Sequence, residues 1–287
     1  MKVSNQIDGY SREALIDYFN SLETSKLASS TMKKYQNILQ NFFIDSQIPL
    51  DELSSDDVFV WLEKYYLDKS KRTIILVISV LRCFFNFCKT EEYIEKKIIK
   101  KRWCPRMPEN IPRYLIDKEI ARLRIQADFL NLRDKTLIEF LLTSGCRRSE
   151  VSGLNVNDIN IDNRTAVVNG KGNQVRTVHF SEKCAYLLKE CLKEHPHEDA
   201  LFLNKYGKRL SSKGIYRITI KAGKMSKLPH RLSPHILRHS FATFMLARGA
   251  NLFFIASELG HKNMNNTRIY AKVLHQDLID EYRRIKE

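Results

Sequence analysis

The chain has 287 residues, of which 43% are hydrophobic and 28% are charged, and this balance excludes a disordered or fibrous protein. Its length suits two domains better than one, because single domains usually hold about 100 to 200 residues. The formal net charge is +15, which indicates a polyanionic partner without identifying it.

No apolar run of the sequence reaches the roughly 18 residues that a membrane span requires, because Arg82 interrupts the run that begins at Ile74. The first residues lack the apolar segment of a secretory signal. We therefore expect a cytoplasmic protein that does not bind membranes. Its six cysteines form no C-x-x-C pair, so we interpret them as small buried hydrophobic residues rather than metal ligands or disulfides.

Four helices are expected in the first hundred residues. The first covers about 11–22, and the second and third begin with serine caps at Ser29 or Ser30 and at Ser54 or Ser55. The fourth, at 70–89, is apolar on most sides. It should therefore occupy the centre of a small helical bundle.

A proline-rich segment follows the predicted bundle. It contains Pro105, Pro108 and Pro112, which neither a helix interior nor a central strand tolerates. We interpret this segment as a linker between domains. The predicted limits are 1–102 for the N-terminal domain, 103–112 for the linker and 113–287 for the C-terminal domain.

The C-terminal part mixes helices with a β-hairpin. Asp117 is expected to cap a helix that reaches Ile125, and Arg133–Thr143 is expected to form a buried helix. Two β-rich stretches, 165–168 and 175–178, flank a glycine- and asparagine-rich turn with Lys171 at its tip. Further helices are predicted at about 181–193, 212–222, 234–248, 252–259 and 275–286.

The positive charge is concentrated in the C-terminal part. Residues 1–105 hold 16 basic and 14 acidic side chains, so the remaining 182 residues have a net charge of +13. Lys205–Arg231 contains nine basic residues and no acidic one. A second cluster comprises Lys96, Lys97, Lys100, Lys101, Arg102 and Arg106. Either run alone could be a solvated face, but both together favour phosphate binding that weakens with salt.

Several polar residues stand out near helix ends. Arg147 follows a Ser-Gly-Cys turn and precedes Glu150, which could hold its side chain. His235 and Arg238 are three residues apart on one helix face. His235 and His239 also share a face, but the glutamate of the H-E-x-x-H zinc pattern is missing, so we do not expect a metal site.

Taken in order, five fragments resemble the boxes of the tyrosine recombinases, the integrase-type family that includes the Xer recombinases. They are SGCRRSE, GKGNQVRTV, HILRH, LGH and TRIYAKV. The resemblance covers roughly residues 111–287, whereas the first hundred residues match only in size and helical character. Cys146 and Arg148 replace aliphatic residues that are common in the first box.

The resemblance implies a mainly α fold with a small β-hairpin, arranged as a two-domain DNA clamp with an N-terminal helical bundle and a C-terminal catalytic domain. It also implies an active site in which Glu150 supports Arg147. The implied catalytic residues are Arg147, Lys171, His235, Arg238, His261 and Tyr270. We expect no separate arm-site domain.

Each residue type suits a part of phosphodiester chemistry. Tyr270 would attack phosphorus and form a 3′-phosphotyrosyl link, while Arg147 and Arg238 would bind the phosphate. Lys171 would protonate the leaving 5′ oxygen. His235 would assist proton transfer at the tyrosine, and His261 would hydrogen-bond a phosphate oxygen. The resemblance therefore implies chemistry without a metal or ATP.

The family further implies a homotetramer on two DNA duplexes that exchanges strands through a Holliday junction. The amphipathic segment 275–285 is expected to dock on a neighbouring subunit, although packing against its own domain is the alternative. A type IB topoisomerase-like enzyme and a non-catalytic DNA-binding protein remain alternative functions. The sequence leaves open the target site, the choice between dimer resolution and mobile-element recombination, and the need for a sister recombinase or accessory protein.

Overall fold

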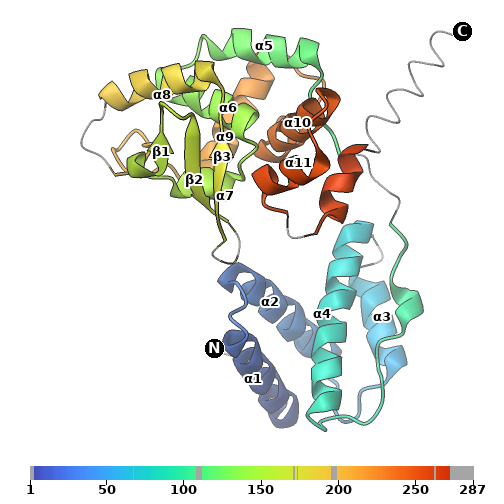
Figure 1. Ribbon diagram of the computed structural model, residues 1–287. Coiled ribbons are helices and arrows are strands. Elements are labelled where there is room, and N and C mark those ends of the chain that lie inside the picture. The colour runs from blue at the N-terminus through green and yellow to red at the C-terminus, as the bar shows by residue number, and fades with distance from the viewer. Residues whose placement is uncertain are drawn as a thin grey trace, which may run out of the picture. The chain divides into compact units, whose positions relative to one another are not determined.

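The computed structural model describes residues 3–66, 68–107, 112–170, 172, 174–194, 199–261 and 263–271. The chain divides into two units, Met1–Glu109 and Asn110–Glu287 (Figure 1). The prediction of a mainly helical fold with a small β-sheet is confirmed. The predicted linker at 103–112 lies partly outside the described residues. Its first residue, Trp103, packs against Phe59 in the first unit.

The described part of the first unit contains the four expected α-helices. They are α1 (Gly9–Thr24), α2 (Ser29–Ser46), α3 (Ser55–Tyr66) and α4 (Lys71–Thr90), followed by a short 3-10 helix at Lys101–Trp103. The hydroxyl oxygens of Ser54 and Ser70 accept hydrogen bonds from backbone N–H groups in the first turns of α3 and α4. The serine cap expected for α2 is wrong, because Ala28 occupies its N-cap position without a side-chain hydrogen bond.

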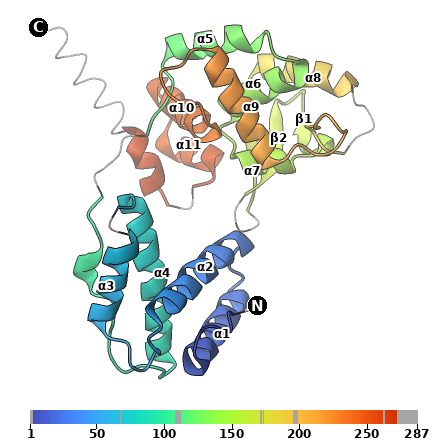
Figure 2. The same cartoon turned by 180° about the vertical axis from the view of Figure 1, so that it is seen from behind.

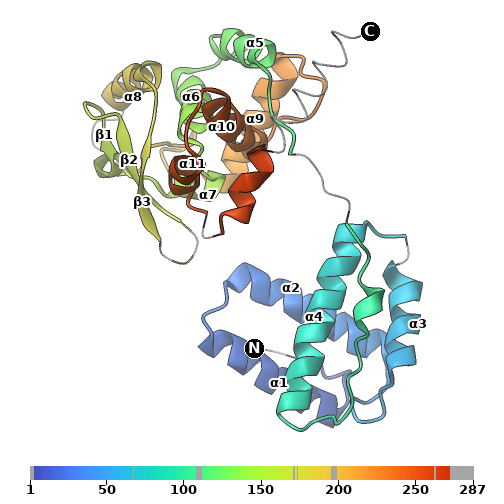
Figure 3. The ribbon, with the colours of Figure 1, turned by 45° about the vertical axis from the view of Figure 1, so that its right-hand side comes forward.

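Helix α4 lies in the middle of the first unit, with α1 and α2 on one side and α3 on the other (Figure 3). Its buried side chains join the aromatic and aliphatic core of this unit. By length and composition alone α4 is apolar enough to cross a membrane, which the sequence interpretation had excluded. The side chains that give it this character, such as Phe84 and Leu81, instead pack against the neighbouring helices.

The second unit begins with three helices and a small sheet. The helices are α5 (Asp117–Ala127), α6 (Leu132–Ser144) and α7 (Arg148–Gly153), followed by a 3-10 helix at Val156–Asp158. The strands are β1 (Ile159–Asn160), β2 (Thr165–Asn169) and β3 (Val175–His179), and the remaining helices are α8 (Glu182–Glu194), α9 (Ser212–Met225), α10 (Pro234–Ala247) and α11 (Leu252–Leu259). Residues 265–271 are also helical.

The predicted hairpin is confirmed as β2 and β3, which pair antiparallel with Ala166 opposite Val178 and Val168 opposite Arg176. Strand β1, which the sequence analysis missed, extends the sheet to the order β1-β2-β3. The buried side chains of Ala166, Val168 and Val178 pack into the core of the unit. Helix α9 packs against both α5 and α7 (Figure 2).

Several local expectations differ from the structure. Helix α7 and the helical residues 265–271 were not predicted. Asp117 lies in the first turn of α5 rather than at its N-cap, and the Glu119 carboxylate instead accepts the Ile116 backbone N–H at 3.1 Å. Lys171 and the predicted helix 275–286 lie outside the described residues. All six cysteines are free, but Cys83 is exposed and Cys104 only partly buried, contrary to the expectation that all are buried.

Candidate active site

Arg147 is the N-cap of helix α7 and follows a tight turn that ends α6. Gly145 forms this turn with a φ of +62°, a conformation that glycine adopts without strain. A Cβ atom at this position would lie only 2.4 Å from Cδ1 of Phe241. The glycine is therefore required twice, once for the turn and once for the close approach of α10.

The Arg147 side chain is held by Glu150, as the sequence analysis predicted. Arg147 Nη1 donates to Glu150 Oε1 at 2.7 Å, and the Arg147 backbone N–H donates to Glu150 Oε2 at 2.7 Å. Glu150 is only 4% exposed. A buried carboxylate is costly unless it is paired, so this glutamate fixes the direction of the arginine.

Arg238 lies on α10, whose start is capped by Ser233 and continues with Pro234 in the first turn. Its side chain is 4% exposed, and its Nη1 donates to the Gly145 carbonyl at 2.8 Å. Burial and the nearby charge of Arg147 lower the pKa of Arg238 to about 10, so the guanidinium remains charged at neutral pH. Both arginines are thus tied to the same turn, because Arg147 follows it in the chain and Arg238 binds its Gly145 carbonyl.

Three guanidinium groups bind successive carbonyls at the C-terminal end of α11. Arg176 Nε donates to the Glu258 carbonyl at 2.8 Å, Arg238 Nη2 to the Leu259 carbonyl at 2.5 Å, and Arg147 Nη2 to the Gly260 carbonyl at 3.2 Å. The last carbonyls of a helix have no partners within the helix, and its C-terminal end favours cations. The end of α11 thus joins Arg147 of the first box, Arg238 of the HILRH box and Arg176 of β3 immediately before His261.

His261 follows Gly260, which ends α11 with a φ of +61°. Its Nδ1 lies 2.8 Å from Oγ1 of Thr267. Partial burial and the charges of nearby arginines, first Arg238 and then Arg147, lower the pKa of His261 to about 4. The free protein therefore presents a neutral imidazole here, which can donate one N–H to an anion.

Tyr270 is 1% exposed and packs with Phe241, Ile255 and Leu259. Its hydroxyl oxygen lies 2.9 Å from Nδ1 of His239. Burial raises the pKa of Tyr270, although the charges of Arg238 and Arg147 act in the opposite direction. The phenol is therefore protonated at neutral pH and sits within electrostatic range of both box arginines.

The histidine that contacts the Tyr270 hydroxyl is His239. The sequence analysis had instead predicted that His235 assists proton transfer at this tyrosine. His235 is exposed, and desolvation together with Arg238, Arg148 and Arg147 lowers its pKa. Burial and His235 lower the pKa of His239 to about 4, so its ring is a neutral hydrogen-bond partner. The HILRH box contains His239, but the sequence analysis considered it only as a metal ligand.

A hollow of about 650 Å³ opens beside these groups, a volume in the range of ordinary ligand sites. It is lined from the first box, the hairpin and the end of α11. Its lining residues are Arg147, Gly170, Gly172, Gln174, Val175, Arg176, Ala256, Ser257, Gly260, His261 and Asn266. The hollow thus joins the ends of both hairpin strands to Arg147 and His261.

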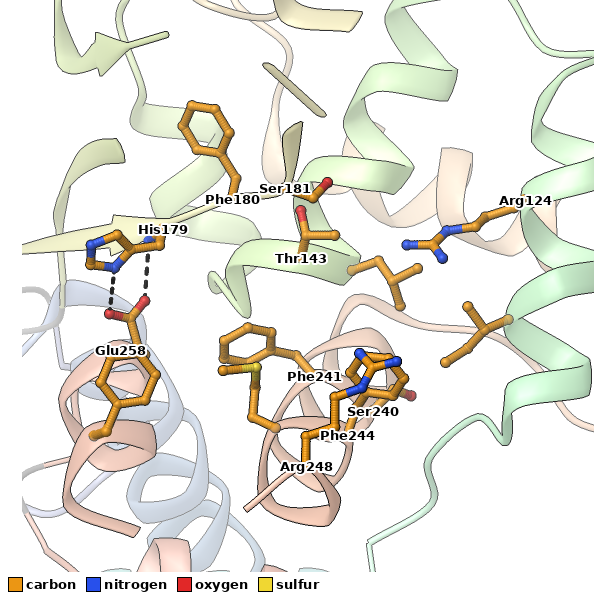
Figure 4. Close-up of a pocket in the computed structure, with 14 residues that line it drawn as sticks. Arg124, Thr143, His179, Phe180, Ser181, Ser240, Phe241, Phe244, Arg248 and Glu258 are labelled. Atoms are coloured by element: carbon orange, nitrogen blue, oxygen red, sulfur yellow. Dashed lines mark hydrogen bonds and ion pairs between the residues drawn. The ribbon is translucent and has the colours of Figure 1, made fainter. Parts of the chain in front are cut away.

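A second cavity, of about 380 Å³, lies between β3, α6 and α10 and is mainly apolar (Figure 4). On one side His179 Nδ1 lies 2.8 Å from Oε1 of Glu258, whose other oxygen accepts the His179 backbone N–H at 3.1 Å. Phe244 lines the cavity with Arg248 stacked on its ring at 3.5 Å.

The arginines of the basic run Lys205–Arg231 have different environments in the structure. Arg209 is structural, because it donates to the carbonyls of Ser152 and Leu154 and to the side chain of Asn155. Tyr216 instead holds two exposed arginines, Arg148 and Arg231, whose guanidinium carbons each lie 5.5 Å from its ring centre. These two cations remain on the surface near the first box.

Among the residues that the structure describes, no group of three or more His, Cys, Asp or Glu side chains could hold a metal ion. The sequence analysis considered His235 and His239 as a possible metal pair. In the structure His235 is exposed, and His239 contacts the Tyr270 hydroxyl.

Comparison with protein families gives two matches. Residues 113–277 match the phage integrase family, and residues 15–92 match the phage integrase N-terminal SAM-like domain. The two matches fall in the two units of the chain. Together they extend the resemblance from the catalytic boxes to the N-terminal bundle.

Similar proteins are found along nearly the whole chain. The tyrosine recombinase XerC of Bacillus subtilis is 32% identical over 95% of this chain and 90% of its own length. The tyrosine recombinase XerD of Oceanobacillus iheyensis is 32% identical over 94% of this chain and 96% of its own length.

Two solved structures have a similar fold. XerH bound to a palindromic difH substrate, in a post-cleavage complex, gives a TM-score of 0.77 at 21% identity and covers 99% of this chain and 91% of its own. A lambda integrase dimer bound to a COC′ core site gives 0.74 at 19% identity and covers 90% of this chain and 94% of its own. At these identities the likeness concerns the fold alone.

Proposed function

Because the chain belongs to the phage integrase family, we propose that it is a tyrosine-type site-specific recombinase, an enzyme that transfers DNA strands between two recombination sites. The observation that supports this activity best is the convergence of four predicted catalytic residues. Arg147, Arg238 and His261 meet at the end of α11, and Tyr270 packs against the same helix.

The reaction begins with attack of the Tyr270 hydroxyl oxygen on the scissile phosphorus. The phosphorus–O5′ bond breaks, a 3′-phosphotyrosyl bond forms, and the 5′ oxygen leaves as a hydroxyl. His239 accepts the phenolic proton, and Lys171 donates a proton to the leaving oxygen. Attack by a 5′ hydroxyl from the partner duplex reverses these steps and rejoins the strands through a Holliday junction.

Arg147 and Arg238 neutralise the non-bridging oxygens of the phosphate. Each guanidinium has five N–H donors, and two of these hold it to Glu150 or to backbone carbonyls in the described structure. The remaining donors bind the phosphate, and His261 adds one more. Charge stabilisation by fixed guanidinium groups requires no divalent metal, and the phosphotyrosyl bond conserves the energy that rejoining needs without ATP.

The substrate is double-stranded DNA, which the two domains, 1–102 and 113–287, enclose as a clamp through the linker at 103–112. Four subunits act on two duplexes in the cytoplasm, alone or with a sister recombinase or accessory protein. Segment 275–285 docks in trans on a neighbouring subunit. Similarity to Xer recombinases favours dimer resolution over movement of a mobile element.

The test begins with the duplex sequence that the wild-type protein enriches from a random-sequence library. The wild type is incubated with a nicked form of this duplex in EDTA, and denaturing gels are examined for a covalent protein–DNA adduct. We expect an adduct with the wild type and none with Tyr270→Phe. If the wild type binds this duplex but forms no adduct, the protein is a binding protein only.

A plasmid assay distinguishes a recombinase from a type IB topoisomerase-like enzyme. A recombinase joins two copies of the selected site and leaves a siteless supercoiled plasmid unchanged. A type IB topoisomerase-like enzyme relaxes the siteless plasmid instead, and that result would reject the recombinase assignment.

A further inference from the structure

Glu150 is bound by two arginines, of which the catalytic assignment uses only Arg147. The second is Arg176 on β3, whose Nη1 and Nη2 donate to Glu150 Oε1 and Oε2 at 2.9 and 3.0 Å. Its side chain is largely buried. The pairing is therefore bidentate, which fixes both oxygens of the carboxylate in one plane.

The second guanidinium changes the electrostatics of the site. Burial alone raises the pKa of Glu150, but hydrogen bonds from Arg176 and Arg147 outweigh burial and lower it. With Arg147 alone, the carboxylate would neutralise the guanidinium that must meet a phosphate. Two guanidinium groups on one carboxylate leave a net positive charge, so Arg147 can be held firmly and still attract an anion.

Arg176 also touches the segment that leads to His261. Its Nε donates to the Glu258 carbonyl at 2.8 Å, and its guanidinium lies against Gly260. A Cβ atom at Gly260 would approach Nη1 of Arg176 to 3.0 Å. Arg176 and Arg147 thus bind carbonyls two residues apart and hold this turn between them.

Strand β3 connects this pair of contacts to the hairpin. Arg176 lies opposite Val168 in the pairing of β2 with β3, at the base of the turn that contains Lys171. A single side chain therefore links the hairpin to α7 through Glu150 and to α11 through Glu258.

We infer that Arg176 is a positioning residue of the recombination site: by holding Glu150 and the end of α11, it directs Arg147 toward the scissile phosphate and fixes the turn before His261. This inference rests on the proposed recombinase function. It assigns Arg176 no contact with DNA, so its loss should slow cleavage without weakening DNA binding.

The test compares Arg176→Gln, Arg176→Lys and wild type on the library-selected nicked duplex, with the rate of adduct formation as the readout. We expect Arg176→Gln to be slower by about 10- to 100-fold, as for other residues that orient a group bound to the reacting centre. Arg176→Lys should recover part of the rate, because it restores charge without the bidentate geometry. Affinity for the duplex should be unchanged.

Arg133→Gln is the matched control. Arg133 also donates to a buried carboxylate, that of Asp134, and to a backbone carbonyl, that of Leu203, but among the described residues it forms no hydrogen bond with the first box. The Arg133→Gln variant should therefore cleave at the wild-type rate. Thermal unfolding of every variant shows whether a slow variant is folded.

Modified substrates separate positioning from folding. A methylphosphonate at the mapped scissile position removes one negative charge, so the defect of Arg176→Gln should shrink on it, as should that of Arg147→Gln. A 5′-bridging phosphorothiolate has a leaving group that needs no proton, so it should rescue Lys171→Ala and not Arg176→Gln.

A double-mutant cycle between Arg176 and Glu150 is the second test, again with the rate of adduct formation as the readout. If Arg176 acts through Glu150, the Arg176→Gln/Glu150→Gln pair should lose far less than the product of the two single losses. A wild-type rate for Arg176→Gln, or an equal defect on phosphodiester and methylphosphonate, would overturn the inference. Absence of any adduct with the wild type would instead reject the proposed function itself.

Discussion

The hydroxyl oxygen of Tyr270 lies 2.9 Å from Nδ1 of His239, in a part of the unit where the tyrosine is almost fully buried. The phenol is protonated there, so the proposed attack on phosphorus needs a proton acceptor. His239 is one residue beyond Arg238 on α10, so the same helix places the tyrosine's hydrogen-bond partner and a guanidinium that is proposed to bind the phosphate.

This relationship predicts that His239→Ala slows adduct formation on the nicked duplex by about 100- to 10,000-fold, the usual contribution of a general base. DNA affinity should not change. His235→Ala is the comparison, since His235 is exposed and, in the described part of the chain, forms no hydrogen bond with Tyr270. A larger loss with His235→Ala than with His239→Ala would return the proton-transfer role to His235.

The turn before Arg147 predicts a large effect of Gly145→Ala. The new methyl group would strain a positive φ and collide with Phe241, so we expect the free energy of unfolding to fall by about 2 to 4 kcal/mol. Urea unfolding measures this loss. Gly207→Ala is the control, because its φ is +70° but nothing lies within 4 Å of the added Cβ, and it should cost only about 1 kcal/mol. Equal losses for the two variants would contradict the close packing of Gly145 on Phe241.

The lowered pKa values of His239 and His261 predict that the protein loses stability in acid. Well above the ordinary histidine pKa of about 6.5, His239 and His261 are neutral in the folded and unfolded chain alike. As the pH falls toward their folded pKa values of about 4, the unfolded chain binds protons that the folded chain does not, so stability falls.

We expect these histidines together to remove about 1 to 3 kcal/mol between about pH 7.5 and pH 5, after allowance for solvent screening. Urea unfolding at both pH values measures the difference. The His239→Gln/His261→Gln double variant cannot titrate at these positions, so its stability should depend less on pH than that of the wild type. An unchanged pH dependence would contradict the lowered pKa values.

The arginines that flank Tyr216 predict a phosphate contact near the cleavage site. Arg231→Gln should weaken binding to the selected duplex and reduce the slope of log K against log salt by about 0.9, the change expected for one lost phosphate contact. Lys193→Gln, which removes a charge already paired with Glu190, should leave the slope unchanged. The same slope for Arg231→Gln and wild type would exclude this contact.

Docking of segment 275–285 in trans predicts the effect of its removal. Deletion of 275–287 should prevent synapsis of two duplexes. Binding to a single site should remain, because the deletion leaves the basic run Lys205–Arg231 intact. Unchanged synapsis and cleavage after the deletion would remove the docking proposal.

The sequence allowed most of the fold to be predicted wherever a repeating pattern marked an element. The long helices α1, α4 and α6 have clear caps or apolar periodicity, and the hairpin has a glycine-rich turn. The six-residue α7 and the two-residue β1 are too short to show a period. They form because neighbouring elements pack on them.

The site was predicted in part for a similar reason. The box residues Arg147, Arg238 and His261 could be identified by order and spacing, and the structure brings them to one helix end. Arg176 could not be identified, because its partners Glu150 and Glu258 lie 26 and 82 residues away in the chain. The role of His239 also depends on a distant residue, Tyr270. Contacts of this kind exist only after folding.

The most direct measurement is identification of the amino acid that becomes linked to DNA. Adduct formed on the selected duplex is digested with nuclease and protease, and the nucleotide-bearing peptide is sequenced by mass spectrometry. We predict that Tyr270 bears a 3′-phosphodeoxynucleotide and that the released strand ends in a 5′ hydroxyl. A nucleotide on any other residue, or a released strand with a 5′ phosphate, would contradict the central claim.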